Sequence, residues 1–161
     1  MTGVPVFRAP MRSRDDAVPE GAAVERALNA GLCGLGARLE AGAADDGPSR
    51  MRLDRRIRRF VAAPDGAFVW TRDADGLWWL GRLAGESFED DDAEARRVDL
   101  VHVRPCRWAP GPVAEADLPA AVRATFARGG RNWQEIHDDA VGASTEAIWS
   151  ARHRHTPCGN G

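Results

Sequence analysis

Few residues of this chain have the types and spacing that catalysis requires. The sequence contains no Gly-x-Ser-x-Gly nucleophile elbow, no Gly-Lys-Ser/Thr phosphate loop and no His-Glu-x-x-His metal helix. His137 precedes Asp138 and Asp139, which places a base beside carboxylates. Adjacent residues seldom face one another, however, and a surface turn is the alternative. We therefore expect no catalytic residue and a binding protein rather than an enzyme; an enzyme that uses His137 is the weakest hypothesis.

Metal and cofactor sites are not expected either. His153, His155 and Cys158 have ligand chemistry, but three donors near a chain end fall short of the four-ligand sites typical of structural zinc. The segment from Gly31 to Gly36 is rich in glycine but lacks the spacing of a dinucleotide fingerprint. Tight backbone packing is the expected role of these glycines. We predict no metal and no cofactor.

Tryptophan is the residue type that most strongly indicates binding. The chain has six tryptophans and no tyrosine. Alternation along a strand at 77–83 sends Trp78 to one face and Trp79 to the other, while Trp70 lies across the expected hairpin. Flat aromatic faces of this kind sandwich nucleobases, at about 1–3 kcal/mol per stacked base. The alternative is ordinary cross-strand packing of the rings in the core.

Arginines supply the second half of a nucleic-acid site. The chain has no lysine, a bias that indicates a GC-rich bacterial genome. Arginine binds phosphate oxygens in a bidentate manner and stacks on bases. One set lies on a predicted helix face and a second flanks the tryptophan strands. The first set is Arg52, Arg55, Arg56 and Arg59, and the second is Arg72, Arg82, Arg104 and Arg107. A solvated helix face is the alternative for the first set.

Length and charge limit the remaining possibilities. A chain of 161 residues fits one domain, which we place at 1–152, followed by a flexible tail at 153–161. A net charge of −2 excludes binding of nucleic acid by bulk charge, so any contact is local. No apolar run approaches the roughly 18 residues of a membrane span, and no signal peptide is evident. We expect a cytoplasmic protein that does not contact membranes.

The elements that must position these side chains follow from periodicity and turn residues. The predicted strands are 4–8, 32–36, 67–71, 77–83, 98–104 and 133–136, and the predicted helices are 22–30, 50–60, 118–126 and 145–152. Residues 40–49 and 86–94 are predicted linkers, and Pro105 is expected to confine its strand to an edge or to bend it. This order favours an α+β fold with a small curled β-sheet or barrel and helices packed outside it.

Several short motifs resemble PUA-like domains of the EVE and YTH type. Phe7 to Met11, the helix after it, and Gly31 to Gly36 resemble the opening of such domains. Residues 65–85 are similar to a hairpin of EVE-like modules associated with modification-dependent restriction systems, and 101–108 resembles their next strand. The resemblance covers residues 4–137. It implies a PUA-like barrel with a non-catalytic pocket for a modified or flipped base, in bacterial antiphage defence or in RNA-related processes.

The resemblance also implies where the pocket lies. It assigns the base site to Arg8, Ala9 and Met11 on the first strand, Leu32, Cys33 and Gly34 after the helix, and Trp70, Arg72, Trp78 and Trp79 on the hairpin. Arg104 is added as a ligand for phosphate or base edges, and Arg52, Arg55, Arg56 and Arg59 as ligands for the backbone. The sequence departs from YTH domains at Leu32 and Cys33, where those domains have a tryptophan.

Two functions remain open at this point. The first is recognition of DNA or RNA through the aromatic pocket, with a protein of a defence system as a further partner. The second is a protein-interaction or regulatory subunit that uses the same barrel and exposes its tryptophans to a partner protein.

Overall fold

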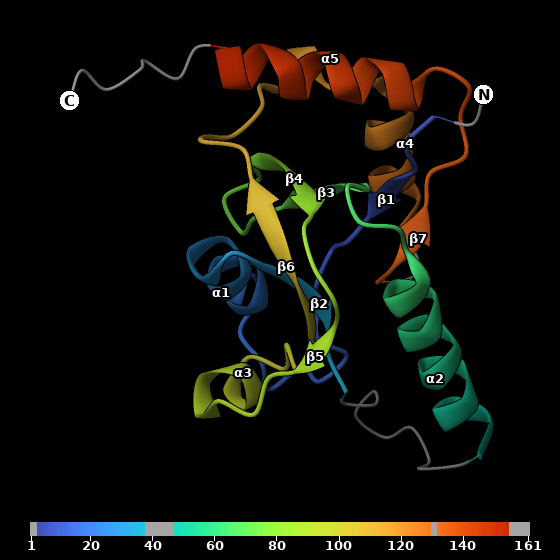
Figure 1. The fold of residues 1–161 in the computed structure, drawn as a ribbon. Helices are drawn as coiled ribbons and strands as arrows, with labels where there is room; N and C mark the ends of the chain where they lie inside the picture. The colour runs from blue at the N-terminus through green and yellow to red at the C-terminus, as the bar shows by residue number, and fades with distance from the viewer. Residues whose placement is uncertain (1–2, 38–46, 130–131, 155–161) are drawn as a thin grey trace.

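One curled, mixed β-sheet organises the chain in the computed structural model, which describes residues 3–37, 47–129 and 132–154 (Figure 1). The strands are β1 (Val6–Arg8), β2 (Leu32–Leu35), β3 (Phe68–Arg72), β4 (Trp78–Leu83), β5 (Phe88–Glu89), β6 (His102–Trp108) and β7 (Gln134–Glu135). Their order is β2-β6-β4-β3-β1-β7, with β5 paired to β6. The β1–β3 pair is parallel and the other strand pairs of the described residues are antiparallel.

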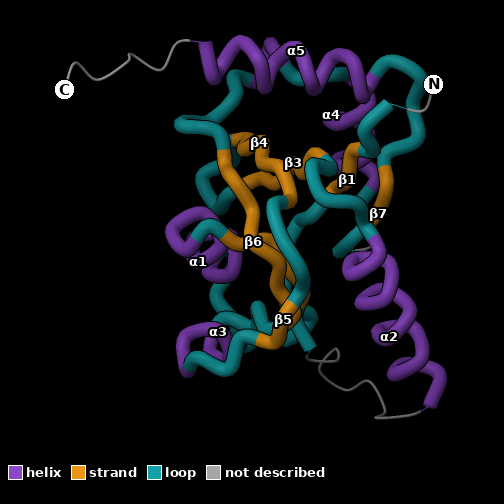
Figure 2. Tube along the Cα trace, in the orientation of Figure 1, coloured by secondary structure: helices purple, strands orange, loops and turns teal. Residues whose placement is uncertain are grey.

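Helices surround this sheet (Figure 2). They are α1 (Ala22–Ala30), α2 (Gly47–Ala62), α3 (Ala93–Arg97), the 3-10 helix η1 (Glu115–Asp117), α4 (Ala120–Arg128) and α5 (Val141–Arg154). The predicted α+β fold, a curled sheet with helices outside, is confirmed. Within the described residues, no helix is both long enough and apolar enough to span a membrane.

The best-predicted elements have clear local signals. Helix α1 has the predicted bounds because Gly31, at φ 68°, adopts the left-handed conformation that ends it and donates its N–H to the Ala27 carbonyl. The β3–β4 hairpin is also confirmed, with Trp70 opposite Leu80. Its turn is closed by the Asp73 carboxylate, which accepts hydrogen bonds from the N–H groups of Asp75 and Leu77.

Two predictions between β4 and β6 are wrong. The expected loop at 86–94 contains β5 and the start of α3, whose first turn is capped by the Asp92 side chain. Strand β6 begins later than predicted and continues through Pro105 between β2 and β4. The Pro105 carbonyl accepts from Ala84 N–H at 2.9 Å, so its ring nitrogen also faces the side where β4 has just ended. The Leu83–Cys106 pairing places Ala84 opposite Pro105, so proline lacks only the reciprocal bond to the Ala84 carbonyl, at the end of β4, which explains why it is tolerated inside the sheet.

The termini of two helices also differ from prediction. Helix α2 begins at Gly47 and ends at Ala62, longer than predicted at both ends. Most of the predicted linker at 40–49 lies outside the described residues. Helix α5 extends to Arg154, two residues into the predicted tail, and residues 155–161 lie outside the described part of the chain. The domain boundary at 152 therefore stays a prediction.

The sheet has a buried core on each face. Neighbouring residues of a strand point to opposite faces, so β1 sends Val6 to one core and Phe7 to the other. The first core contains Phe7, Val69, Leu83, Phe60 of α2 and Trp133. The second contains Val6, Phe68, Trp70, Trp78 and Trp149 of α5. Because helices cover both faces, an alternating strand pattern here does not indicate an exposed face.

Candidate nucleic-acid interface

A cleft of about 530 Å³ opens at the C-terminal end of β1. Its walls come from the loop after β1, the start of α1, the β3–β4 turn, the end of α4 and the segment before β7. We call this cavity the β1 cleft and define it by Arg8, Met11, Arg12, Arg72, Phe126 and Asn132. Its volume lies within the roughly 300–1,000 Å³ typical of sites for small ligands.

Arg8 is the most unusual residue of the β1 cleft. Only 4% of its surface is exposed. Its Nη1 donates to the Gly129 carbonyl at 2.9 Å, whereas its Nε is buried and has no acceptor, and no described carboxylate pairs with it. Burial lowers the pKa of Arg8, and the nearby charge of Arg128 lowers it further. The cleft wall thus contains a buried cation with donors left for an anion or a carbonyl edge.

Two guanidinium groups flank a pair of aromatic rings along one wall. The Arg8 guanidinium carbon lies 5.1 Å from the Phe126 ring centroid. The Phe126 ring meets Trp78 edge-on at 5.0 Å, and the Arg72 guanidinium carbon lies 4.9 Å from the Trp78 ring centroid. Half-buried Phe126 lines the cleft, while Trp78 lies beneath it. Phe126 is therefore the aromatic face that a bound base would meet.

Asn132 fixes the loop after β1. Its Nδ2 donates to the Arg12 carbonyl at 2.8 Å, and its Oδ1 accepts from the Arg12 N–H at 3.2 Å. This pair of hydrogen bonds ties the β1 loop to the segment that precedes β7. Phe126 and Asn132 were both missed by the sequence analysis, since neither position has a motif and only tertiary packing brings them to β1.

The predicted tryptophan cage is wrong. Trp70 has no exposed surface, and its Nε1 donates to Thr145 Oγ1 at 3.2 Å. Trp78 is 4% exposed, and half-buried Trp79 donates to Asp73 Oδ2 at 2.8 Å. None of the six tryptophans, all of which are described, is fully exposed. The alternative function, a subunit with exposed tryptophans, loses its structural basis by the same finding.

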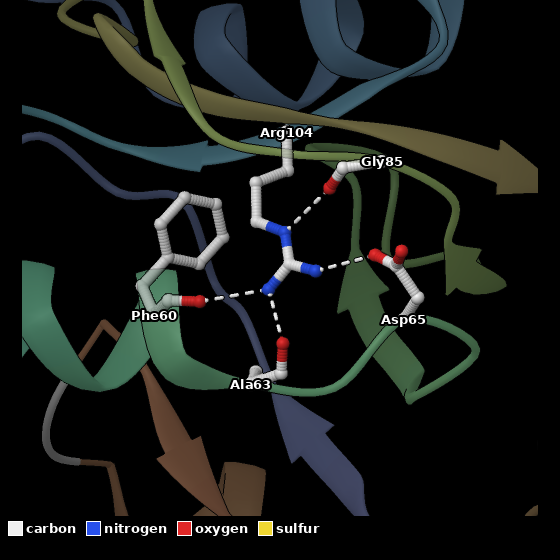
Figure 3. A network of polar contacts seen from close by, with 5 residues as sticks. All are labelled: Phe60, Ala63, Asp65, Gly85 and Arg104. Carbon is white, nitrogen blue, oxygen red and sulfur yellow. Dashed lines mark hydrogen bonds and ion pairs between the residues drawn. The ribbon is translucent and has the colours of Figure 1, made fainter.

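Arg104, predicted as a ligand for phosphate or base edges, instead lies in a network of contacts within the protein (Figure 3). It is 3% exposed. Its Nε donates to Gly85 O at 2.9 Å, its Nη1 donates to the carbonyls of Phe60 and Ala63 at 3.0 and 2.6 Å, and its Nη2 pairs with the Asp65 carboxylate at 2.8 Å. The Phe60 carbonyl also accepts from the Ala63 N–H at 3.3 Å, whereas the Ala63 carbonyl has no other donor among the described residues. Arg104 therefore joins α2 to β6.

Four further predicted residues pack in the sheet rather than in the cleft. Ala9 and Cys33 have no exposed surface, and Leu32 is 9% exposed. A Cβ at Gly34 would collide with the His102 carbonyl. Burial raises the pKa of the Cys33 thiol to about 12, although the charge of Arg104 opposes this shift. Of the residues predicted for the base site, the structure brings only Arg8, Met11 and Arg72 to the β1 cleft.

The predicted backbone arginines do lie together. Arg52, Arg55, Arg56 and Arg59 line a small groove of about 150 Å³ with Trp133. We call this the α2 groove. It shares no lining residue with the β1 cleft.

His137, the residue considered for catalysis, pairs with Glu135 and not with the adjacent aspartates. His137 is exposed, and its Nε2 lies 3.3 Å from the Glu135 carboxylate. Within the described residues, no group of three or more potential metal ligands occurs. His155 and Cys158 lie outside the described part of the chain.

Comparison of the sequence with protein-family models and with curated proteins finds no match. Two solved structures are similar to the whole fold. One is the YTH domain of the Zygosaccharomyces rouxii MRB1 protein in complex with N6-methyladenosine RNA, at a TM-score of 0.50 and 15% identity over 94% of this chain and 87% of that one. The other is the Pho92 YTH domain in complex with m6A, at a TM-score of 0.51 and 13% identity over 92% of this chain and 85% of that one. The fold is therefore YTH-like.

Proposed function

We propose that this protein is a non-catalytic nucleic-acid-binding domain that recognises a modified base in the β1 cleft. The YTH-like fold supports this proposal, because both similar structures are complexes that contain N6-methyladenosine. The proposed binding requires no cofactor and no chemical reaction. Because the hairpin resembles EVE-like modules, we further propose a role in bacterial defence. A role in RNA-related processes is the alternative.

The observation that carries the proposal is the state of Arg8. The buried guanidinium has an unpartnered Nε and no carboxylate partner among the described residues, so the protein leaves part of its hydrogen-bonding capacity and its charge unused. Phosphate oxygens and the acceptor edges of bases both satisfy such donors.

The other walls of the β1 cleft suit a base. Phe126 offers an aromatic face, and Met11 and Val24 offer apolar surface. Met11 is held at φ 51°, in the left-handed region, which fixes the direction in which the loop leaves β1. An apolar wall can sense a methyl group, because one methyl in a hydrophobic pocket changes binding by about 1–3 kcal/mol.

The proposal is tested by anisotropy titration of fluorescein-labelled, nine-nucleotide single strands of RNA and DNA. Each strand carries a central adenine or N6-methyladenine, and unlabelled strands serve as competitors. We expect saturable binding and, for the methylated RNA, an affinity about 10-fold higher than for the unmodified RNA. Equal binding of methylated and unmodified strands would overturn recognition of this modification. Absence of binding to every strand at low salt would overturn the nucleic-acid function itself.

A further inference from the structure

The α2 groove has a face of regularly spaced arginines. Positions 52, 55, 56 and 59 are three, four and seven residues apart, which places them on one side of a helix. The helix rises about 1.5 Å per residue, so the row extends over roughly 10 Å. Arg55 and Arg59 have no carboxylate partner among the described residues. Ile57 and Phe60 lie on a neighbouring side of α2, toward the core.

Every side chain that lines the α2 groove is a hydrogen-bond donor and none is an acceptor. Arginine has five donor hydrogens, and the indole of Trp133 has only its Nε1–H. Trp133 is 2% exposed, and its Nε1 has no acceptor among the described residues. The ring is fixed by a stack on Phe7 at 4.5 Å and by the edge of Phe60 at 4.9 Å. The groove therefore fits a group that is anionic and only accepts hydrogen bonds, as a phosphodiester does.

The size of the α2 groove favours phosphate over base. Its volume of about 150 Å³ is half the roughly 300 Å³ at which sites for whole small ligands begin. A phosphate group with its surrounding water fits such a volume. The groove is thus suited to the backbone of a polymer whose other parts lie elsewhere.

The α2 groove and the β1 cleft meet at one end of the β1–β7 pair. These strands are antiparallel, with Arg8 opposite Gln134, so the residues just before β7 lie beside the end of β1. Asn132 lines the β1 cleft and its neighbour Trp133 lines the α2 groove. In β1, Arg8 lines the β1 cleft, while its neighbour Phe7 stacks on Trp133 of the α2 groove. Adjacent residues of the segment before β7 therefore line the two cavities.

We propose that the α2 groove binds the phosphodiester backbone of the same single strand whose base occupies the β1 cleft. The ligand class is then an oligonucleotide, because a nucleoside or mononucleotide fills the β1 cleft alone. This inference rests on the proposed function of the β1 cleft. An acidic protein segment has similar anionic chemistry, and the test below separates it from a nucleic acid.

The experiment compares two RNA lengths and two double variants of the full chain. The RNAs are a trinucleotide and a nonanucleotide, each with a central N6-methyladenosine. Arg55→Ala/Arg59→Ala removes two charges from the groove. The matched control, Arg58→Ala/Arg107→Ala, removes two exposed arginines that do not line it. Affinities are measured by anisotropy across a salt series, and an oligoglutamate peptide is tested as a competitor.

We expect the nonanucleotide to bind the natural protein more tightly than the trinucleotide. Arg55→Ala/Arg59→Ala should lower the salt slope of nonanucleotide binding by about 1.4, at roughly 0.7 per lost contact to a single strand, and leave the trinucleotide affinity unchanged. The control should change neither value.

Three results would overturn the inference. If the control lowers the slope as much as the groove variant, general charge explains the effect. If the oligoglutamate displaces the nonanucleotide as effectively as RNA of equal charge does, the groove is a protein site. If the trinucleotide binds as tightly as the nonanucleotide, the groove contributes nothing while the proposed function stands. Absence of trinucleotide binding to the natural protein would instead overturn the proposed function, and this inference with it.

Discussion

Arg8 on β1 and Arg104 on β6 are both buried, with 4% and 3% of their surfaces exposed, but their surroundings differ. Arg104 donates to three backbone carbonyls and to the Asp65 carboxylate, all within 3.0 Å. Arg8 donates to one carbonyl, retains an unpartnered buried Nε and lines a cleft. Burial alone therefore does not distinguish an arginine whose donors are used by the fold from one that keeps donors for a ligand. The two arginines differ in how many of their N–H donors find acceptors within the protein.

The largest effect should come from breaking the Arg104 network. Arg104→Met removes the donors of three buried or partly buried carbonyls and leaves Asp65 without its partner. We expect a loss of about 2–4 kcal/mol in the free energy of unfolding, because a buried carbonyl that loses its donor costs about 1–3 kcal/mol, whereas the Asp65 side chain is 68% exposed and its ion pair contributes little. Urea denaturation measures it, and Arg107→Met, an exposed arginine on the same strand, is the matched control. Equal stability of the two variants would mean that Arg104 does not hold α2 to β6.

Arg8→Met should have the opposite profile. Few protein contacts are lost, so the free energy of unfolding should change by no more than about 1 kcal/mol. Binding of methylated RNA should weaken by about 10-fold or more, since a hydrogen bond to a charged group contributes about 1.5–3 kcal/mol. Urea denaturation and anisotropy on the same sample give both values. A large loss of stability with unchanged affinity would reverse the roles assigned to the two arginines.

A smaller effect is expected from Phe126→Leu, which keeps apolar volume in the β1 cleft but removes the ring. Loss of one stacking face should weaken binding by about 1 kcal/mol, or about fivefold. The variant also loses the edge contact to Trp78, so its melting temperature is measured beside its affinity. Unchanged affinity for every base would remove Phe126 from the site.

The smallest effect concerns Cys33, which the resemblance placed in the base pocket. Its pKa is raised from 9.0 to about 12 by burial, so the thiol stays protonated and unreactive in the folded protein at pH 8. Iodoacetamide followed by peptide mass spectrometry should label Cys33 only after unfolding. The raised pKa stabilises the fold fully below pH 9, and this contribution decreases as the pH rises toward 12. Rapid native labelling, prevented by RNA, would return Cys33 to the site.

The sequence predicted local structure better than the surroundings of each side chain. Helix α1 and the β3–β4 hairpin follow from a C-terminal glycine and an Asp-Gly turn, which act within a few residues. Trp70 and Trp78 could not be placed in the same way, because alternation assigns a side chain to a face but does not show whether α4 and α5 cover that face. Strand β6 was misjudged for a related reason, since only its partners show that Pro105 faces the end of β4.

The candidate site was predictable only in part. The resemblance brought Arg8, Met11 and Arg72 to one place, and their shared position in the β1 cleft agrees with it. Phe126 and Asn132 come from α4 and from the segment before β7, more than one hundred residues beyond β1. No local pattern marks either residue. The pairing of β1 with β7 brings Asn132 to the loop after β1, and that pairing is a property of the tertiary fold.

The central claim is that Arg8, and not Arg104, binds the ligand. The most direct measurement is a ¹H–¹⁵N correlation spectrum of arginine Nε–H groups during titration with an RNA trinucleotide that contains N6-methyladenosine. Arg8 Nε has no acceptor in the protein, whereas Arg104 Nε donates to Gly85 O. We predict a large shift of the Arg8 Nε–H resonance, with shifts of the backbone amides of Gly76 and Asn132, which both line the β1 cleft, and no change at Arg104. An unchanged Arg8 resonance at saturation would contradict the account.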